Sequence, residues 1–190
     1  MTLQSILDFA HSLLKNAANT GDTLIDCTMG NGHDTLFLAN LVGRQGRVFA
    51  FDIQQDALEQ TRTLLDEHHA VKQVTLIHES HAVLATRIPT ELHGRVQAAV
   101  FNLGYLPGGD KSICTAPETT IQALEELLPI LAPGGVIVVV VYPGHRAGQV
   151  ETARVLEYCS GLPREFVHVV AYRILNNPNQ PPFVIALEKK

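Results

Sequence analysis

One stretch near the N-terminus, residues 23–35, constrains the fold more than any other part of the chain. Its sequence, TLIDCTMGNGHDT, begins with apolar residues typical of a buried strand and ends in polar residues that can open a helix. Between them, Gly30 and Gly32 allow a tight turn and the close approach of a ligand to the backbone. The free amides at the start of the helix favour a polar or anionic ligand group. We therefore expect a strand, a glycine turn and a helix arranged around a ligand.

A second candidate strand, 47–52, ends in an acidic residue, Asp52. Asp52 lies 20 residues after Gly32. This is close to the spacing of about 20 residues at which a carboxylate binds ribose hydroxyls in dinucleotide-binding folds. We predict that the glycine turn and Asp52 bind one nucleoside-bearing cofactor. In the purely structural alternative, the glycines only make a turn and Asp52 only caps a helix beginning at Gln55.

The rest of the chain alternates between short apolar runs and longer amphipathic runs, as strands and helices do. Further strands are predicted at 74–78, 96–101, 136–142 (after a turn at 133–135), 166–173 and 182–187. Helices are predicted at 2–16 (capped by Thr2), after the glycine turn, at 55–69, at 117–131 and at 149–160, with a short one ending at Ile88. His11 on the first helix is expected to be a surface or core residue. The last two strands are too close for a helix between them, so they must run antiparallel. The pattern predicts one α/β domain over 1–190, a doubly wound seven-stranded sheet with a C-terminal antiparallel hairpin.

Composition excludes several classes of protein. Hydrophobic residues make up 46% of the chain and charged residues 17%, which argues against disorder. The net charge of −5 argues against a broad basic surface for nucleic acid but leaves room for a local one. The longest apolar run, 136–142, is too short to cross a bilayer, and no secretory segment is recognised. We therefore expect no membrane association. Three widely spaced cysteines without a CxxC pair favour a reducing, cytoplasmic setting with no disulfide frame and no metal site.

The glycine turn favours one kind of cofactor over another. Thr35 stands where the third glycine of the NAD fingerprint would be, and Asp34 in the first helical turn would repel a pyrophosphate. A ligand with an ammonium and a sulfonium group tolerates that carboxylate better. The C-terminal hairpin points the same way. Here the sequence resembles the class I S-adenosylmethionine-dependent methyltransferases, which share a Rossmann-like fold.

That resemblance implies a cofactor site. Asp26, Gly30 and Gly32 match the acid and glycines of the first methyltransferase motif, and Asp52 matches the acid that binds the ribose. Residues after the third strand usually contact adenine in these enzymes. The implied cofactor-binding set is Asp26, Thr28, Gly30, Asn31, Gly32, His33, Asp34, Thr35, Asp52, Ile53, Ser80, His81, Asn102 and Leu103.

The fourth strand leads into Asn102-Leu103-Gly104-Tyr105, which resembles the Asn-Pro-Pro-Tyr motif of methyltransferases acting on exocyclic amines. In that motif the asparagine accepts hydrogen bonds from the target amine and the aromatic ring stacks on the base. The amine must be neutral to attack, so much of the catalysis would be positioning. For an alkyl amine, Asp110 or His145 could take the proton. The expected catalytic residues are Asn102, Tyr105 and Asp110, and the expected substrate-binding residues are Tyr105, Lys111, His145 and Arg146.

The segments 26–35 and 102–111 together resemble a small bacterial family labelled as rRNA methylases, which is linked to tRNA wobble-uridine modification. The resemblance implies methylation of the primary amine of 5-aminomethyl-2-thiouridine, with the anticodon region of tRNA as partner. The residues alone indicate only a methyltransferase acting on nitrogen. Methylation of rRNA, a small molecule or a protein amine stays open, as do a non-catalytic nucleoside-binding subunit and, more remotely, an NAD-dependent oxidoreductase. The first helix or the hairpin could support a homodimer.

Overall fold

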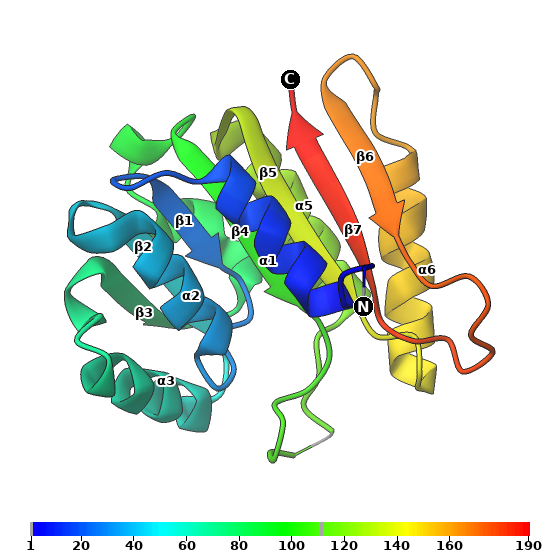
Figure 1. The fold of residues 1–190 in the computed structure, drawn as a ribbon, viewed down its shortest axis with the longest axis horizontal. Helices are drawn as coiled ribbons and strands as arrows, with labels where there is room; N and C mark the ends of the chain where they lie inside the picture. Colours follow the sequence, from blue (N-terminus) through cyan, green and yellow to red (C-terminus); the bar gives the residue numbers. More distant parts are fainter. Residues whose placement is uncertain (1, 111) are drawn as a thin grey trace.

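Seven strands form one mixed sheet in the computed structural model, which describes residues 2–110 and 112–190 (Figure 1). The strand order is β3-β2-β1-β4-β5-β7-β6. Strands β1 to β5 pair in parallel, while β7 runs antiparallel to both β5 and β6. The strand bounds are β1 Thr23–Asp26, β2 Arg47–Asp52, β3 Val74–His78, β4 Val96–Asn102, β5 Leu131–Val141, β6 Val167–Tyr172 and β7 Phe183–Lys189. The predicted doubly wound sheet with a C-terminal antiparallel hairpin is confirmed.

The described chain has six α-helices and four short 3-10 turns, and all of them except α1 lie between strands. The α-helices are α1 Ile6–Ala17, α2 His33–Val42, α3 Gln55–Glu67, α4 Leu84–Arg87, α5 Pro117–Ile130 and α6 Arg146–Ser160. The 3-10 turns are η1 Gly43–Gln45, η2 Val71–Gln73, η3 His81–Val83 and η4 Thr90–Leu92. No helix in the described ranges has both the length and the apolar character that a bilayer crossing requires.

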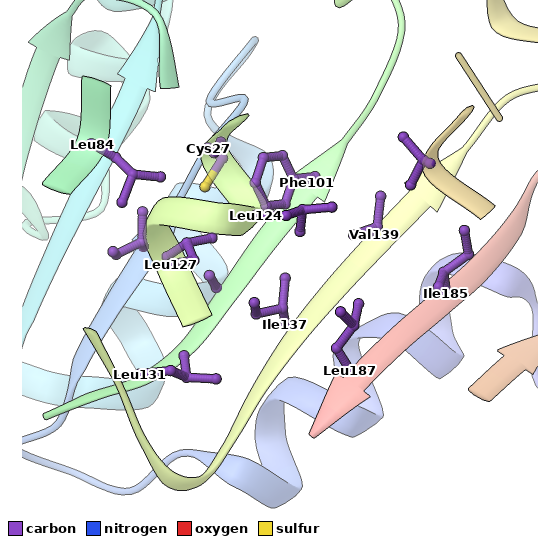
Figure 2. Packing of buried hydrophobic residues seen from close by; sticks show 14 of the residues in the cluster. Cys27, Leu84, Phe101, Leu124, Leu127, Leu131, Ile137, Val139, Ile185 and Leu187 are labelled. Carbon is purple, nitrogen blue, oxygen red and sulfur yellow. The ribbon is translucent and has the colours of Figure 1, made fainter. Parts of the chain in front are cut away.

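The two faces of the sheet are covered by different helices, because successive side chains of a strand point to opposite faces. Leu24 of β1 belongs to the core under α1, α2 and α3, whereas its neighbour Ile25 belongs to the core under α4, α5 and α6. Figure 2 shows Leu124 and Leu127 of α5 packed over the second of these cores. Burial on both faces explains why the central strands read as continuous apolar runs.

Several element ends differ from the predictions by one or more residues, and the local structure explains the starts of α1, β5 and α6. Ser5, and not Thr2, caps α1, because its Oγ accepts a hydrogen bond from Asp8 N at 3.2 Å. Strand β5 begins at Leu131, since residues 133–135 form an irregularity within the pairing to β4 and do not end it. Helix α6 begins at Arg146, where the Nδ1 atom of His145 accepts a hydrogen bond from Gly148 N at 3.1 Å.

The sheet has a topological switch point between β1 and β4. From β1 the chain first builds outward through β2 and β3, and it then returns to add β4 on the other side of β1. Ligands of such sheets bind beyond the carboxyl ends of the strands at this point. The two carboxyl ends are joined here, because Asn102 N donates a hydrogen bond to Thr28 Oγ1 at 2.7 Å.

Candidate active site

A cavity of about 1180 Å³ opens at the carboxyl edge of the sheet. Residues that follow β1, β2, β3, β4 and β5 line it, as the switch-point topology requires. Two further segments close its sides: α1, through Leu7 and His11, and the loop 179–182 before β7. Helix α1 packs on the face of the sheet across β5 and β4 (Figure 1). Its residues therefore line the cavity from the side, whereas most of the other lining residues lie at or after the ends of strands.

The glycine turn after β1 depends on two residues in left-handed backbone conformations. Gly30 has φ +49° and Gly32, which precedes α2, has φ +85°. A Cβ atom on Gly32 would lie 2.9 Å from the Cα of Thr61 in α3, which is closer than real contacts allow. Gly30 lines the cavity and Gly32 does not. Gly32 therefore lets two helices meet, while Gly30 presents backbone to a ligand.

Asp52 at the end of β2 is bonded directly to this turn. Its Oδ2 accepts a hydrogen bond from Gly30 N at 3.0 Å, and its Oδ1 accepts one from Gln54 N at 3.0 Å. A carboxylate offers about four lone-pair positions, so both oxygens can still accept from a ligand's hydroxyl groups. Asp52 and its neighbour Ile53 both line the cavity.

Asp26 and Thr35 lie beneath the turn and do not line the cavity. Thr35 Oγ1 donates to Asp26 Oδ2 at 2.6 Å, and Thr28 N donates to Asp26 Oδ1 at 3.1 Å. Burial, assisted by the charge of Asp34, raises the pKa of Asp26 to about 7. These two side chains, placed in the expected cofactor set, brace the backbone that faces the cavity.

His81 supplies a buried hydrogen-bond acceptor after β3. Its Nδ1 lies 2.9 Å from the carbonyl oxygen of Cys27, which can only accept, so Nδ1 carries the proton and Nε2 is the acceptor. Nε2 is buried and has no partner among the described residues, although His81 lines the cavity. Burial lowers the pKa of His81 and keeps the ring neutral. An orphaned acceptor of this kind fits a ligand's amino or hydroxyl group. Ser80, also in the wall, accepts from Ala82 N at 3.2 Å.

Asn102 at the end of β4 has a defined orientation. Its Nδ2 lies 3.3 Å from Asp34 Oδ2. A carboxylate only accepts hydrogen bonds, so this contact assigns the amide nitrogen to Asp34 and leaves Oδ1 as an acceptor. Tyr142 stands beside the same group after β5. Burial and the charge of Asp34 raise the pKa of Tyr142, while a hydrogen bond with the Asn102 side chain lowers it.

His11, which was expected to be a surface or core residue, lines the cavity from α1. Its Nε2 lies 2.7 Å from Asp34 Oδ1, and its ring stacks on Phe37 with centroids 4.0 Å apart. The hydrogen bond to Asp34 raises the pKa of His11 against the opposing effect of burial. One feature of the sequence could have indicated this position: His11 lies in the apolar stripe of a helix, between Ala10 and Leu14, which are both buried.

The loop after β4 is anchored to a buried acid. Gly104 N donates to Thr115 Oγ1 at 2.9 Å, and Thr115 Oγ1 donates to Glu151 Oε2 at 2.7 Å. Burial raises the pKa of Glu151, which also accepts from Thr120 Oγ1 at 2.8 Å. The loop presents Tyr105, whose ring centroid lies 6.1 Å from that of His145. Sequence reasoning missed Glu151 and Thr115, because an acid inside a helix resembles a surface residue.

The remaining expected residues divide into two groups. Those that line the cavity are Thr28, Asn31, His33, Asp34, Leu103, Tyr105 and His145. Asp110 and Arg146 are exposed and do not line it. A hydrogen bond from Ser112 N lowers the pKa of Asp110, which makes it a poor proton acceptor. Lys111 lies outside the described residues. In the part of the chain that the structure covers, no group of three or more His, Cys, Asp or Glu side chains could hold a metal ion.

Three relatives are similar to this chain, one in sequence and two in both sequence and structure. A curated chloroplastic tRNA (mnm(5)s(2)U34)-methyltransferase of Arabidopsis thaliana is 40% identical over 96% of this chain and 69% of its own length. A Clostridium thermocellum structure described as a putative rRNA methylase is 42% identical, with a TM-score of 0.96 and full coverage of both chains. A Streptococcus mutans structure described as a putative methyltransferase, in complex with S-adenosylhomocysteine (SAH), is 35% identical, with a TM-score of 0.89 and full coverage of both chains.

The reversed β7 strand and the cavity at the switch point, together with these relatives, define the protein as an S-adenosylmethionine-dependent methyltransferase. Within that class, the family model described as "Putative rRNA methylase" matches residues 48–188. The chain belongs to this family.

Proposed function

We propose that this enzyme methylates a primary amine on RNA, namely the aminomethyl group of 5-aminomethyl-2-thiouridine at the wobble position of tRNA. The observation that carries the proposal is the orientation of Asn102, whose Nδ2 is engaged by Asp34 while Oδ1 is left to accept an N–H from a substrate. The name of the Arabidopsis relative, which is 40% identical, supports the choice of nucleoside.

The cofactor site that we propose follows the geometry of the cavity. The Asp52 carboxylate would receive the ribose hydroxyls, while the unpaired Nε2 of His81 would accept a hydrogen bond from the adenosine portion. The backbone around Gly30 would face the methionine portion. Asp26, Gly32 and Thr35 would act on this site through the shape of the turn.

Bound S-adenosylmethionine would supply an electrophilic methyl group on its sulfonium. Asn102 Oδ1 would accept one N–H of the amine and thereby direct the nitrogen lone pair toward the cavity. Fixing this direction lowers the entropic part of the barrier, because a correctly oriented pair reacts far faster than a freely moving one. The Asn102 backbone is itself tied to Thr28 Oγ1, so the amide is carried on a rigid strand end.

Substrate recognition would use the exposed Tyr105 ring, which is 40% accessible and stands beside His145. Anticodon loops present unstacked bases on which an aromatic ring can stack. Arg146, exposed at the start of α6, would meet phosphates at the rim. Lys111, which lies outside the described residues, stays a predicted substrate contact. A few local cations suffice for this role in a chain of net charge −5.

We further propose that residues 1–190 form a single methyltransferase domain that acts in the cytoplasm. The continuous seven-stranded sheet supports the first statement, and the three free cysteines support a reducing compartment. We also propose that the chain forms a homodimer. Equilibrium sedimentation of the purified chain would test it.

Nucleoside mass spectrometry tests the substrate. In a strain that lacks this protein, tRNA should accumulate 5-aminomethyl-2-thiouridine and lose its methylated form. The purified enzyme with S-adenosylmethionine should restore the methylated nucleoside on that tRNA, but not on tRNA whose wobble uridine lacks the aminomethyl group. An unchanged nucleoside profile in the deletion strain would remove this substrate, and methylation of rRNA or of a free amine in its place would redirect the assignment.

A further inference from the structure

The reaction that we propose needs a proton acceptor that the expected residues do not supply. An alkyl amine is mostly protonated near neutral pH, and its ammonium form has no lone pair. Of the two acceptors that the sequence suggested, Asp110 does not line the cavity, while the His145 Nδ1 atom is occupied by Gly148 N. The inference below rests on the proposed function, because it concerns the same amine.

We propose that His11, oriented by Asp34, is the general base that takes the proton from the substrate ammonium. Both residues line the cavity beside Asn102, which binds the other oxygen of the Asp34 carboxylate. A single carboxylate thus connects the base to the amide that orients the amine. His11 comes from α1, a helix outside the strand ends that usually carry the chemistry of this fold.

The hydrogen bonds define the tautomer. Asp34 Oδ1 is 2.7 Å from His11 Nε2 and only accepts, so Nε2 carries a proton and Nδ1 has the free lone pair. Nδ1 has no hydrogen-bond partner among residues 2–110 and 112–190, while stacking on Phe37 fixes the plane of the ring. About one third of the side chain (34%) is exposed, which gives a proton taken up at Nδ1 a path to solvent.

The proposed step accounts for every proton and electron pair without another reactant. His11 Nδ1 takes one proton from the ammonium, directly or through one water, and the imidazolium that forms is stabilised by the Asp34 carboxylate. The neutral amine nitrogen then bonds to the methyl carbon as the carbon–sulfur bond breaks, and that electron pair stays on sulfur. The product amine keeps the positive charge, and His11 returns its proton to solvent.

The surrounding charges favour a base near neutral pH. Asp34 faces His11 from α2, and Asp8 acts from its own helix. The charge of Asp34 also raises the pKa of Tyr142, which follows β5, and the pKa of the buried Asp26 of β1. The carboxylates stabilise the imidazolium, and Asp34 raises the pKa of His11.

The test compares His11→Gln with His168→Gln, a matched change at an exposed position on β6. Glutamine keeps a donor for Asp34 but cannot titrate. Single-turnover methylation of tRNA carrying the aminomethyl group should fall about 10²- to 10⁴-fold near pH 7 in His11→Gln. The deficit should shrink as pH rises toward the pKa of the amine itself, because the substrate then needs no base. His168→Gln should match the wild type, and calorimetry should give unchanged S-adenosylmethionine affinity for both variants.

A second measurement does not depend on activity or on the first variant. NMR titration of the His11 ring should give a pKa above the ordinary 6.5 in the wild type and a lower one in Asp34→Asn. Two results would overturn the inference while leaving the proposed function standing: a wild-type rate and pH profile in His11→Gln, or a loss explained by weaker cofactor binding. A wild-type enzyme that methylates no tRNA amine at any pH would instead overturn the proposed function, and the inference with it.

Discussion

Gly30 N lies 3.0 Å from Asp52 Oδ2, so the turn after β1 and the tip of β2 form one hydrogen-bonded unit. Asp52 therefore has two roles, since it holds the turn and still offers lone pairs to a ligand. The free energy of cofactor binding should depend on both roles at once. This pair gives the most direct test of the cofactor site.

Asp52→Ala should weaken S-adenosylmethionine binding by roughly 1–3 kcal/mol, the scale of leaving buried polar groups unpaired. The loss includes the Gly30 amide, which no longer has an acceptor. Isothermal calorimetry measures the change, with Asp56→Ala on the exposed first turn of α3 as the control. Near-normal affinity in Asp52→Ala would show that the ribose is bound elsewhere.

Asn102→Ala should slow methyl transfer by about 10²-fold or more, the scale seen when an orienting contact is lost. The affinity for S-adenosylmethionine should change much less, because the backbone contact from Asn102 N to Thr28 Oγ1 survives the substitution. Single-turnover rates and calorimetry on the same protein separate the two effects. Asn40→Ala, exposed on α2, is the matched control. If the transfer rate and the S-adenosylmethionine affinity fell equally, Asn102 would bind the cofactor and would not orient the amine.

Gly32→Ala should lower the free energy of unfolding more than Gly94→Ala does. Both positions have positive φ (+85° and +77°), so both variants carry backbone strain of about 1–2 kcal/mol. Only Gly32 would also place its Cβ 2.9 Å from Thr61 Cα, whereas Gly94 has open space around it. Urea denaturation of the two variants isolates the contribution of the close approach. Equal destabilisation would mean that α2 and α3 can separate without cost.

Asp26 should make stability depend on pH in a defined direction. Its pKa is raised from 3.8 to about 7 in the folded protein, so folding favours the protonated form. This contribution is complete below about pH 4 and is lost as pH rises through 7. Asp26→Asn, which cannot ionise, should therefore gain stability relative to the wild type between pH 4 and pH 8. Urea denaturation across this range measures the difference, and a constant difference would show that Asp26 is ionised in the folded protein.

The elements that follow local patterns were predictable, and those that depend on the packing of distant segments were not. The glycine turn, the acid at the end of β2 and the final hairpin each have a signature within a few residues. The start of β5 was misplaced because Pro133, Gly134 and Gly135 are typical of a turn, and only the pairing with β4 keeps them in the strand. The position of His11 in the cavity wall could not be predicted, because it depends on how α1 packs across β4 and β5. Asp110 was favoured because it lies in the same motif as Asn102, yet the chain turns away from the cavity before reaching it.

The position of α1 also has a consequence for biogenesis. Phe9 stacks on Tyr172 with ring centroids 4.0 Å apart, and the Tyr172 hydroxyl donates to the Gln4 carbonyl, so α1 is held against β6. Strand β6 is synthesised long after α1, which has no such partner while the chain is still being translated. The packing of α1, the helix that carries His11, is therefore complete only when the closing hairpin docks, whereas its contacts with β4 and β5 involve segments that are synthesised earlier.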